Sequence, residues 1–181
     1  MTDTPSTAGA GYSDVGWRIA LIVLIIATIT LFGGMNARLG LGGALLKPGT
    51  LEFEEYIPPD AEREVFRQFS LTGVVTAVSY LIALASGTVF LLLTPLKVRE
   101  NGWLMLSAIL VYVWVPVEIY TMVLDLRMGY LEIFTTEGNA AFRELFLRRA
   151  GALAGTPFIA HLCYYTVIVL AVLRPLQRRS A

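Results

Sequence analysis

Four long apolar runs constrain this chain more than any other feature of its sequence. A segment needs roughly 20 mostly apolar residues to cross a hydrocarbon core of about 30 Å. The runs that meet this requirement cover residues 17–35, 71–93, 103–124 and 152–173. The sequence therefore predicts an all-α integral membrane protein with four transmembrane helices.

The composition of the 181 residues agrees with this prediction and narrows the available functions. Hydrophobic residues make up 56% of the chain and charged residues only 15%, proportions unsuited to a surface that faces water. The 14 basic and 14 acidic side chains cancel, so no basic excess favours binding to nucleic acid. A single Cys163 excludes an internal disulfide, and a single His161 excludes the paired axial ligands of a membrane b-type haem.

The first apolar run could be taken for a secretory signal because it lies near the N-terminus. However, Asp3 and Asp14 precede it, Arg18 is its only basic residue, and no clear small-x-small cleavage site follows. We therefore expect a retained helix, preceded by a disordered or loosely held tail at residues 1–15.

The chain repeats itself after 80 positions. Residues 49–99 align with residues 129–179 without a gap, and Gly16-Trp17 corresponds to Gly102-Trp103 after a small gap. Chance similarity is common between apolar helices, but it does not explain matches in the polar loops. We interpret the pattern as a duplication, with one hairpin repeat at 16–99 and another at 102–179. Identical pairs include Glu52 and Glu132, Arg63 and Arg143, Phe66 and Phe146, and Pro95 and Pro175.

The even number of spans in each repeat determines the expected topology. Both repeats would cross the membrane in the same direction, as parallel hairpins related by an axis near the bilayer normal. The two long loops would share one side, and both termini would share the other side with the connection at residues 95–102. Basic residues are denser in the short loops, which favours cytoplasmic termini, but more numerous in the long loops, which favours the opposite orientation. We expect a multi-pass protein of the cell inner membrane with cytoplasmic termini.

The second helix of each repeat is predicted to extend beyond the membrane as an amphipathic helix. Pro58-Pro59-Asp60 is typical of a helix start, and no proline follows until Pro95. An equivalent helix would start at Asn139, with a kink at Pro157. The apolar faces of these extensions either pack on the protein or lie at the headgroup boundary, or they dock a partner. The docking candidates are Val65, Phe66, Phe69, Phe142, Leu145 and Phe146.

A glycine-rich apolar segment at residues 40–48 separates the first span from the first of these extensions. Glu52, Glu54 and Glu55 follow it. We expect a flexible loop here that dips into the membrane interface or meets another chain.

Three ionisable side chains, Glu118, Asp125 and His161, lie within the predicted spans or at their ends, where charge is costly. Glu118 and His161 lie at similar depth, and Asp125 follows Glu118 on the same helix face. A proton relay or a cation site is one interpretation. The other is a single interhelical hydrogen bond worth about 1 kcal/mol. The equivalent positions hold Phe32 and Leu81, so a polar pair would belong to one repeat only.

Small residues at four-residue spacing predict close helix contacts, because they let two backbones approach. Ser79, Ala83 and Gly87 form such a stripe in the second span, and Gly151 and Gly155 form another at the start of the fourth. Whether they face each other or another subunit is left open by the sequence.

No metal site, cofactor or catalytic set is expected. His161 and Cys163 lie two positions apart and point to nearly opposite sides of a helix, so they cannot hold one ion together. No phosphate-binding glycine loop and no nucleophile with a base at recognisable spacing is present. Aromatic residues in the spans could stack on a lipid, quinone or pigment, although such residues more often fill space between helices.

These patterns favour a structural role over catalysis. The first interpretation is a non-catalytic subunit or scaffold of a larger bacterial inner-membrane complex, in contact with lipid and with other membrane subunits. The alternative is a small transporter or channel with Glu118 and His161 as an intramembrane proton or cation site. An enzyme that acts on a lipid or quinone ranks third, because no catalytic residues converge.

Overall fold

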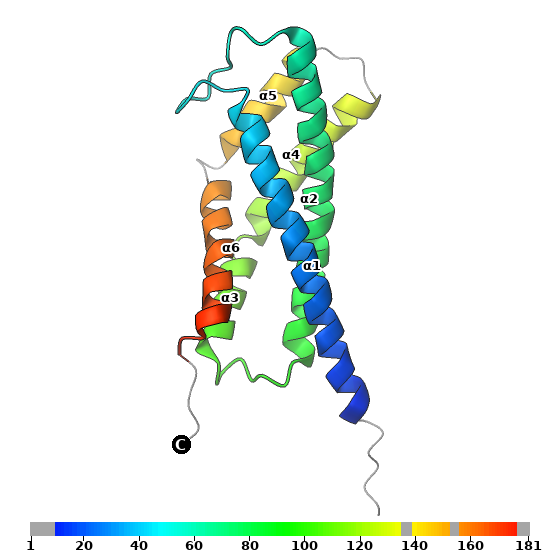
Figure 1. The fold of residues 1–181 in the computed structure, drawn as a ribbon, viewed down its shortest axis with the longest axis vertical. Helices are drawn as coiled ribbons and strands as arrows, with labels where there is room; N and C mark the ends of the chain where they lie inside the picture. The colour runs from blue at the N-terminus through cyan, green and yellow to red at the C-terminus, as the bar shows by residue number, and fades with distance from the viewer. Residues whose placement is uncertain (1–9, 135–138, 153–155, 177–181) are drawn as a thin grey trace, which may run out of the picture.

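The computed structural model describes residues 10–134, 139–152 and 156–176. Within these ranges the chain is helical apart from its connecting loops and one isolated β-bridge between Leu46 and Phe53. The helices form an elongated bundle (Figure 1). They are α1 (Ala10–Gly43), α2 (Pro59–Leu93), α3 (Gly102–Tyr112), α4 (Val115–Phe134), α5 (Asn139–Ala150) and α6 (Thr156–Leu173).

Three helical stretches are long and apolar enough to cross a membrane: Val15–Gly43, Pro59–Leu93 and Gly102–Phe134. The apolar helix Pro157–Leu173 is shorter than these three. Pro157 lies in its first turn, where proline is tolerated, and Pro175 follows its last turn, where proline cannot continue the helix. The predicted all-helical class is confirmed, whereas the fourth predicted span is shorter than expected.

The helix ends and connecting loops gather at the two ends of the bundle. The start of α1 and the end of α6 lie at the same end of the bundle as the connection between α2 and α3 (Figure 1). The loop between α1 and α2 lies at the opposite end. α2 has proline and acidic residues in its first turn and ends just before Pro95, as the sequence predicts.

The first helix extends beyond the predicted end of the first span. α1 reaches Gly43, so the glycine-rich segment at residues 40–43 is helical, and the expectation of a flexible loop there is wrong. Glycine is a poor helix former. An added Cβ at Gly42 would be in ordinary van der Waals contact with the Phe146 ring, at 3.4 Å. The longer helix also places Arg38 inside the bundle.

Two glycines bring α1 and α2 close together. A Cβ added to Gly34 would overlap the Cγ2 methyl of Thr76 on α2. A Cβ added to Gly73 on α2 would lie 3.4 Å from the guanidinium of Arg38. These close approaches resemble the small-residue packing of membrane helices, although neither glycine belongs to the predicted stripes.

The predicted packing residues are placed less uniformly. Ser79 is buried, Ala83 is half-buried, and a Cβ on Gly87 would lie at an ordinary 3.6 Å from Leu24 of α1. Gly151 is exposed at the C-terminal end of α5. Gly155 lies outside the described residues.

The third predicted helix is interrupted. It breaks between α3 and α4 because Pro116 has no N–H to donate to the carbonyl of Tyr112. α4 then continues to Phe134, beyond the predicted end of the span at Leu124. The predicted single helix from Asn139 is likewise divided into α5 and α6.

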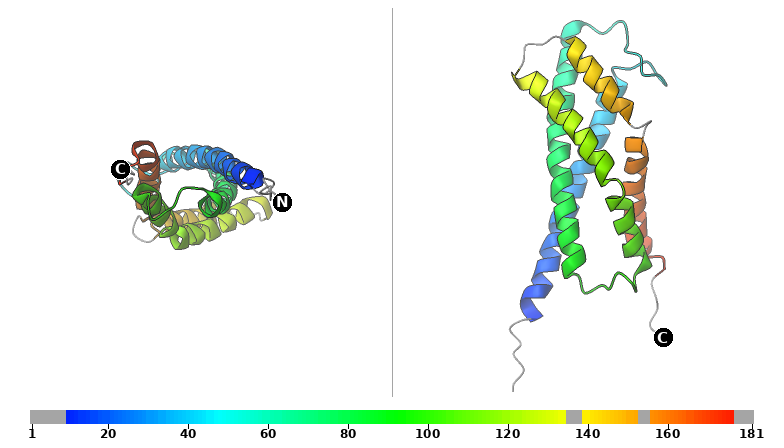
Figure 2. Two further views of the ribbon diagram at one scale, coloured as in Figure 1. Left: turned by 90° about the horizontal axis from the view of Figure 1, so that it is seen from below. Right: turned by 180° about the vertical axis from the view of Figure 1, so that it is seen from behind.

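The apolar faces of the two extensions pack against each other. α5 lies beside the N-terminal part of α2 (Figure 2, right). The Phe66 and Phe142 rings stack with centroids 4.2 Å apart, and Phe53 and Phe146 surround them. Of the six docking candidates, Phe66, Phe69, Phe142 and Phe146 are buried in this cluster, and Val65 and Leu145 pack against it. These residues therefore do not form an exposed docking surface.

Candidate functional site

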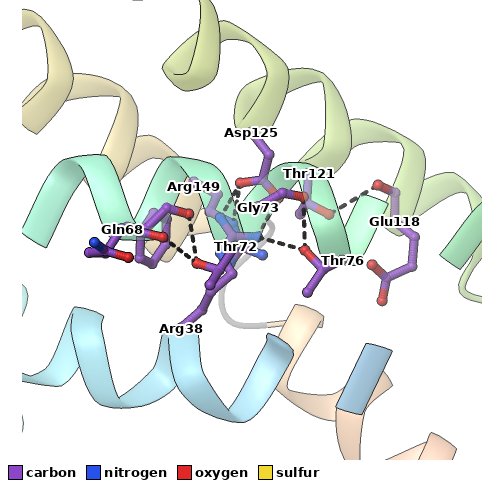
Figure 3. A network of polar contacts seen from close by, with 10 residues as sticks. Arg38, Gln68, Thr72, Gly73, Thr76, Glu118, Thr121, Asp125 and Arg149 are labelled. Carbon is purple, nitrogen blue, oxygen red and sulfur yellow. Dashed lines mark hydrogen bonds and ion pairs between the residues drawn. The ribbon is translucent and has the colours of Figure 1, made fainter. Parts of the chain in front are cut away.

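Arg38 on α1, Asp125 on α4 and Arg149 on α5 form a charged cluster (Figure 3). Arg38 donates from Nη1 to Asp125 Oδ2 at 2.6 Å and from Nη2 to Oδ1 at 2.5 Å. Arg149 donates from Nε to Asp125 Oδ1 at 2.8 Å. One carboxylate therefore accepts from two guanidinium groups, so the cluster carries one positive charge in excess.

The cluster is buried, and α2 supports it from one side. Arg38 is 6% exposed, Asp125 is 5% exposed and Arg149 is 24% exposed. The Arg38 Cζ lies 4.1 Å from the centroid of the Phe69 ring, which favours a cation–π contact. Thr76 Oγ1 accepts a long hydrogen bond of 3.4 Å from Arg38 Nη1. Charges this deeply buried are costly unless they are paired and hydrogen-bonded.

A cavity of about 380 Å³ adjoins the cluster. The three charged side chains line part of it. The remaining wall is mainly apolar and comes from α1, α2, α4, α5 and α6, including Leu31, Ala77 and Met122. Leu39 and Phe158 line the same cavity while being 53% and 57% exposed, so they mark its rim. The cavity thus combines charged side chains with a mainly apolar wall and opens between α1 and α6.

Glu118 and His161 both line this cavity, but their contacts differ. Tyr164 donates a hydrogen bond of 3.0 Å to Glu118 Oε1. The buried His161 ring meets Phe32 and Tyr165 edge-on, at centroid distances of 5.7 and 4.9 Å. No hydrogen bond joins Glu118 to His161 in the part of the chain that the structure describes.

Two buried nitrogen atoms beside the cavity lack a hydrogen-bond partner among the described residues. They are Nε of Arg38 and Nδ1 of His161. An unpaired buried polar group costs about 1 to 3 kcal/mol. Other atoms of both side chains line the cavity, whereas the two nitrogens themselves are covered by protein atoms.

A second charged contact ties α2 to α5. Arg143 donates from Nε to Glu62 Oε1 at 2.5 Å, and Asn139 donates from Nδ2 to Glu62 Oε2 at 2.9 Å. Glu62 is buried, whereas Arg143 is exposed. The hydrogen bond to Glu62 raises the pKa of Arg143 above its usual value.

The sequence predicts Asp125 as a candidate but neither of its partners. Arg38 lies beyond the predicted end of the first span at residue 35, and Arg149 lies in the predicted amphipathic extension from Asn139. One signal was available: a carboxylate inside an apolar bundle needs a cation, and Arg38 is the first basic residue after the predicted first span.

Within the described ranges, no group of three or more His, Cys, Asp or Glu side chains could hold a metal ion. Comparisons with known protein families, with curated proteins and with solved structures find no match for this chain. The function is therefore argued from the geometry of the charged cluster, the cavity and the contacts between the two halves of the chain.

Proposed function

We propose that this chain is a non-catalytic subunit or scaffold of a larger bacterial inner-membrane complex. The observation that carries the proposal is the Arg38–Asp125–Arg149 cluster, which uses the buried charges to join the two halves of the chain. Charged side chains that are paired with each other fix the relative position of the helices that carry them. Such pairing favours a structural role over a catalytic one.

Further contacts between the halves lie along the bundle. Glu62 binds Arg143, the Thr88 and Tyr112 hydroxyls are 2.6 Å apart, and Asn36 contacts the hydroxyl of Tyr165. A transporter that works by alternating access needs one repeat to rock against the other. Contacts at several levels oppose such rocking, which supports the scaffold over the transporter.

We also propose that the chain crosses the membrane four times as two parallel hairpin repeats, with cytoplasmic termini. Contacts between equivalent positions support this duplication. The Phe66 and Phe146 rings, 80 residues apart, have centroids 6.5 Å apart. Asn139 contacts the backbone oxygen of Pro59, also 80 residues earlier, at 3.4 Å. Equivalent residues meet each other only near the axis that relates two repeats.

Co-purification tests the scaffold function most directly. The tagged full-length chain is expressed at its native level in its own host and extracted with a mild detergent. We expect the same partner proteins at a fixed molar ratio, measured by quantitative mass spectrometry. An unrelated tagged four-span protein at the same level serves as the control. Isolation of a solitary chain, or of proteins also captured by the control, would count against the proposal.

A small transporter or channel is the second candidate, favoured by one observation. Glu118 and His161 line the same cavity, as a proton or cation site would require. Glu118→Gln keeps an oxygen that can accept from Tyr164, so the fold is expected to survive. If this candidate is right, the substitution abolishes proton or cation flux in liposomes, while Glu144→Gln on the exposed surface leaves flux intact. Unchanged flux in Glu118→Gln would remove Glu118 from any transport mechanism.

A further inference from the structure

We propose that the cavity beside the Arg38–Asp125–Arg149 cluster binds an anionic amphiphile. The negatively charged head group lies at the two arginines. The apolar chain runs along the cavity and leaves it between α1 and α6. This binding site goes beyond the scaffold function and does not depend on it.

Charge is the first argument for an anionic head group. Asp125 neutralises only one of the two guanidinium groups that it contacts. Glu118 adds a carboxylate to the same cavity, but it contacts Tyr164 and forms no ion pair with either arginine within the described residues, so it leaves the second guanidinium without a counter-charge in contact. An excess buried cation is expensive in an apolar environment, so an anion that completes the pairing is favoured.

Unpaired polar atoms provide the second argument. Arg38 is more than nine-tenths buried, and its Nε has no partner among the described residues, although both of its Nη atoms are paired. His161, which also lines the cavity, has an unpaired and covered Nδ1. A carboxylate or phosphate offers several acceptor oxygens to such groups. A head group would reach the two nitrogens after a small movement of the Arg38 or His161 side chain.

The shape of the cavity accounts for the apolar part of the ligand. A volume of about 380 Å³ lies within the range of small-molecule sites, roughly 300 to 1,000 Å³. Most of its wall is apolar, and its rim at Leu39 and Phe158 is exposed. An apolar chain too long for the cavity can therefore continue along the outer surface of α1 and α6.

The test uses the delipidated full-length protein in a non-ionic detergent, with oleate as the probe. Oleyl alcohol has the same chain without the charge, and inorganic phosphate has the charge without the chain. We expect saturable binding of one oleate per chain by isothermal titration calorimetry. Oleyl alcohol and phosphate are each expected to bind at least about tenfold more weakly, as for loss of one charge-assisted or apolar contact.

Two variants and a matched control locate the site. Arg149→Gln removes the excess charge and leaves the Arg38–Asp125 pair intact, so oleate should bind about tenfold more weakly. Leu39→Trp narrows the rim from an exposed position and should also weaken oleate binding. Arg148→Gln changes an adjacent arginine that is exposed and outside the cavity, and it should bind oleate as the parent protein does.

Several results would overturn the proposal. One is equal affinity for oleate and oleyl alcohol. Another is an equal effect of Arg149→Gln and Arg148→Gln on the affinity for oleate. A third is phosphate binding that is as tight as oleate binding and unaffected by Leu39→Trp. Nanodiscs then identify the source of the ligand. Loss of oleate binding in phosphatidylglycerol but not in phosphatidylcholine supports a bilayer lipid as the occupant. Oleate binding retained in both supports a free fatty acid.

Discussion

Arg38 and Asp125 lie 87 positions apart in the sequence and meet through two hydrogen bonds that engage both carboxylate oxygens. Two-point pairing of this kind holds both side chains in one geometry. Because Arg38 belongs to α1 and Asp125 to α4, the pair joins the two halves of the chain at a buried point. Arg149 adds a second donor from α5.

The first prediction concerns loss of this carboxylate. Asp125→Asn leaves the buried Arg38 and the partly exposed Arg149 without their shared counter-charge, so we expect the free energy of unfolding to fall by about 3 to 5 kcal/mol. Thermal unfolding of the purified protein in detergent measures the change. Asp60→Asn, at an exposed position, is the matched control and should have little effect. Equal stability of the two variants would show that the cluster contributes little to the fold.

Adjacent glycines on α1 provide a second prediction. At Gly33 an added Cβ would meet nothing within 4 Å, so Gly33→Ala should stabilise the helix by up to about 1 kcal/mol. At Gly34 the same change collides with Thr76, whose hydroxyl is bonded to Gly73 O at 2.9 Å and cannot turn away freely. Gly34→Ala should therefore destabilise by about 1 to 3 kcal/mol. Opposite shifts in melting temperature are the expected signature, and shifts of the same sign would refute the close contact.

A third prediction separates buried from exposed phenylalanines. Phe142 is 4% exposed and stacks on Phe66, whereas Phe134 is 70% exposed. Phe142→Ala should cost about 3 to 5 kcal/mol, because it leaves a cavity in the packed cluster. Phe134→Ala should change stability by less than about 0.5 kcal/mol. Denaturant unfolding compares the two, and similar losses would contradict the packing of α5 on α2.

A fourth prediction concerns rigidity between the halves. Spin labels at Leu81 on α2 and Leu162 on α6 occupy exposed positions, with Cys163 replaced by serine to remove the native thiol. A scaffold should give one narrow distance distribution by pulsed electron paramagnetic resonance. Two populations whose ratio changes with an ion gradient would favour the transporter instead.

Apolar runs predicted the helical class, because length and hydrophobicity act locally. The ends and breaks of the helices were less predictable. Residues 40–43 include three glycines yet remain helical, although glycine is a poor helix former. No local pattern predicts that α1 continues through them. Pro116 lies at the break between α3 and α4, but the apolar residues on both sides of it predict one continuous span.

The candidate site was predicted only in part, for the same reason. Glu118, Asp125 and His161 stood out because they are ionisable residues in apolar surroundings. Their partners were not evident, since Arg38 lay beyond the predicted end of its helix and Tyr164 is an unremarkable residue of an apolar helix. The buried phenylalanines of the extensions were recognised as apolar faces, but their mutual packing requires the arrangement of α2 and α5 in space.

The long separation between Arg38 and Asp125 has a consequence for biogenesis. Chains emerge from the ribosome at about 5 to 20 residues per second, so a separation of 87 positions corresponds to a delay of the order of 10 s. During that interval the first hairpin carries a cation inside an apolar helix without its counter-ion. Release of this hairpin alone into lipid is therefore unfavourable. We expect it to enter the lipid only after the second hairpin has been made.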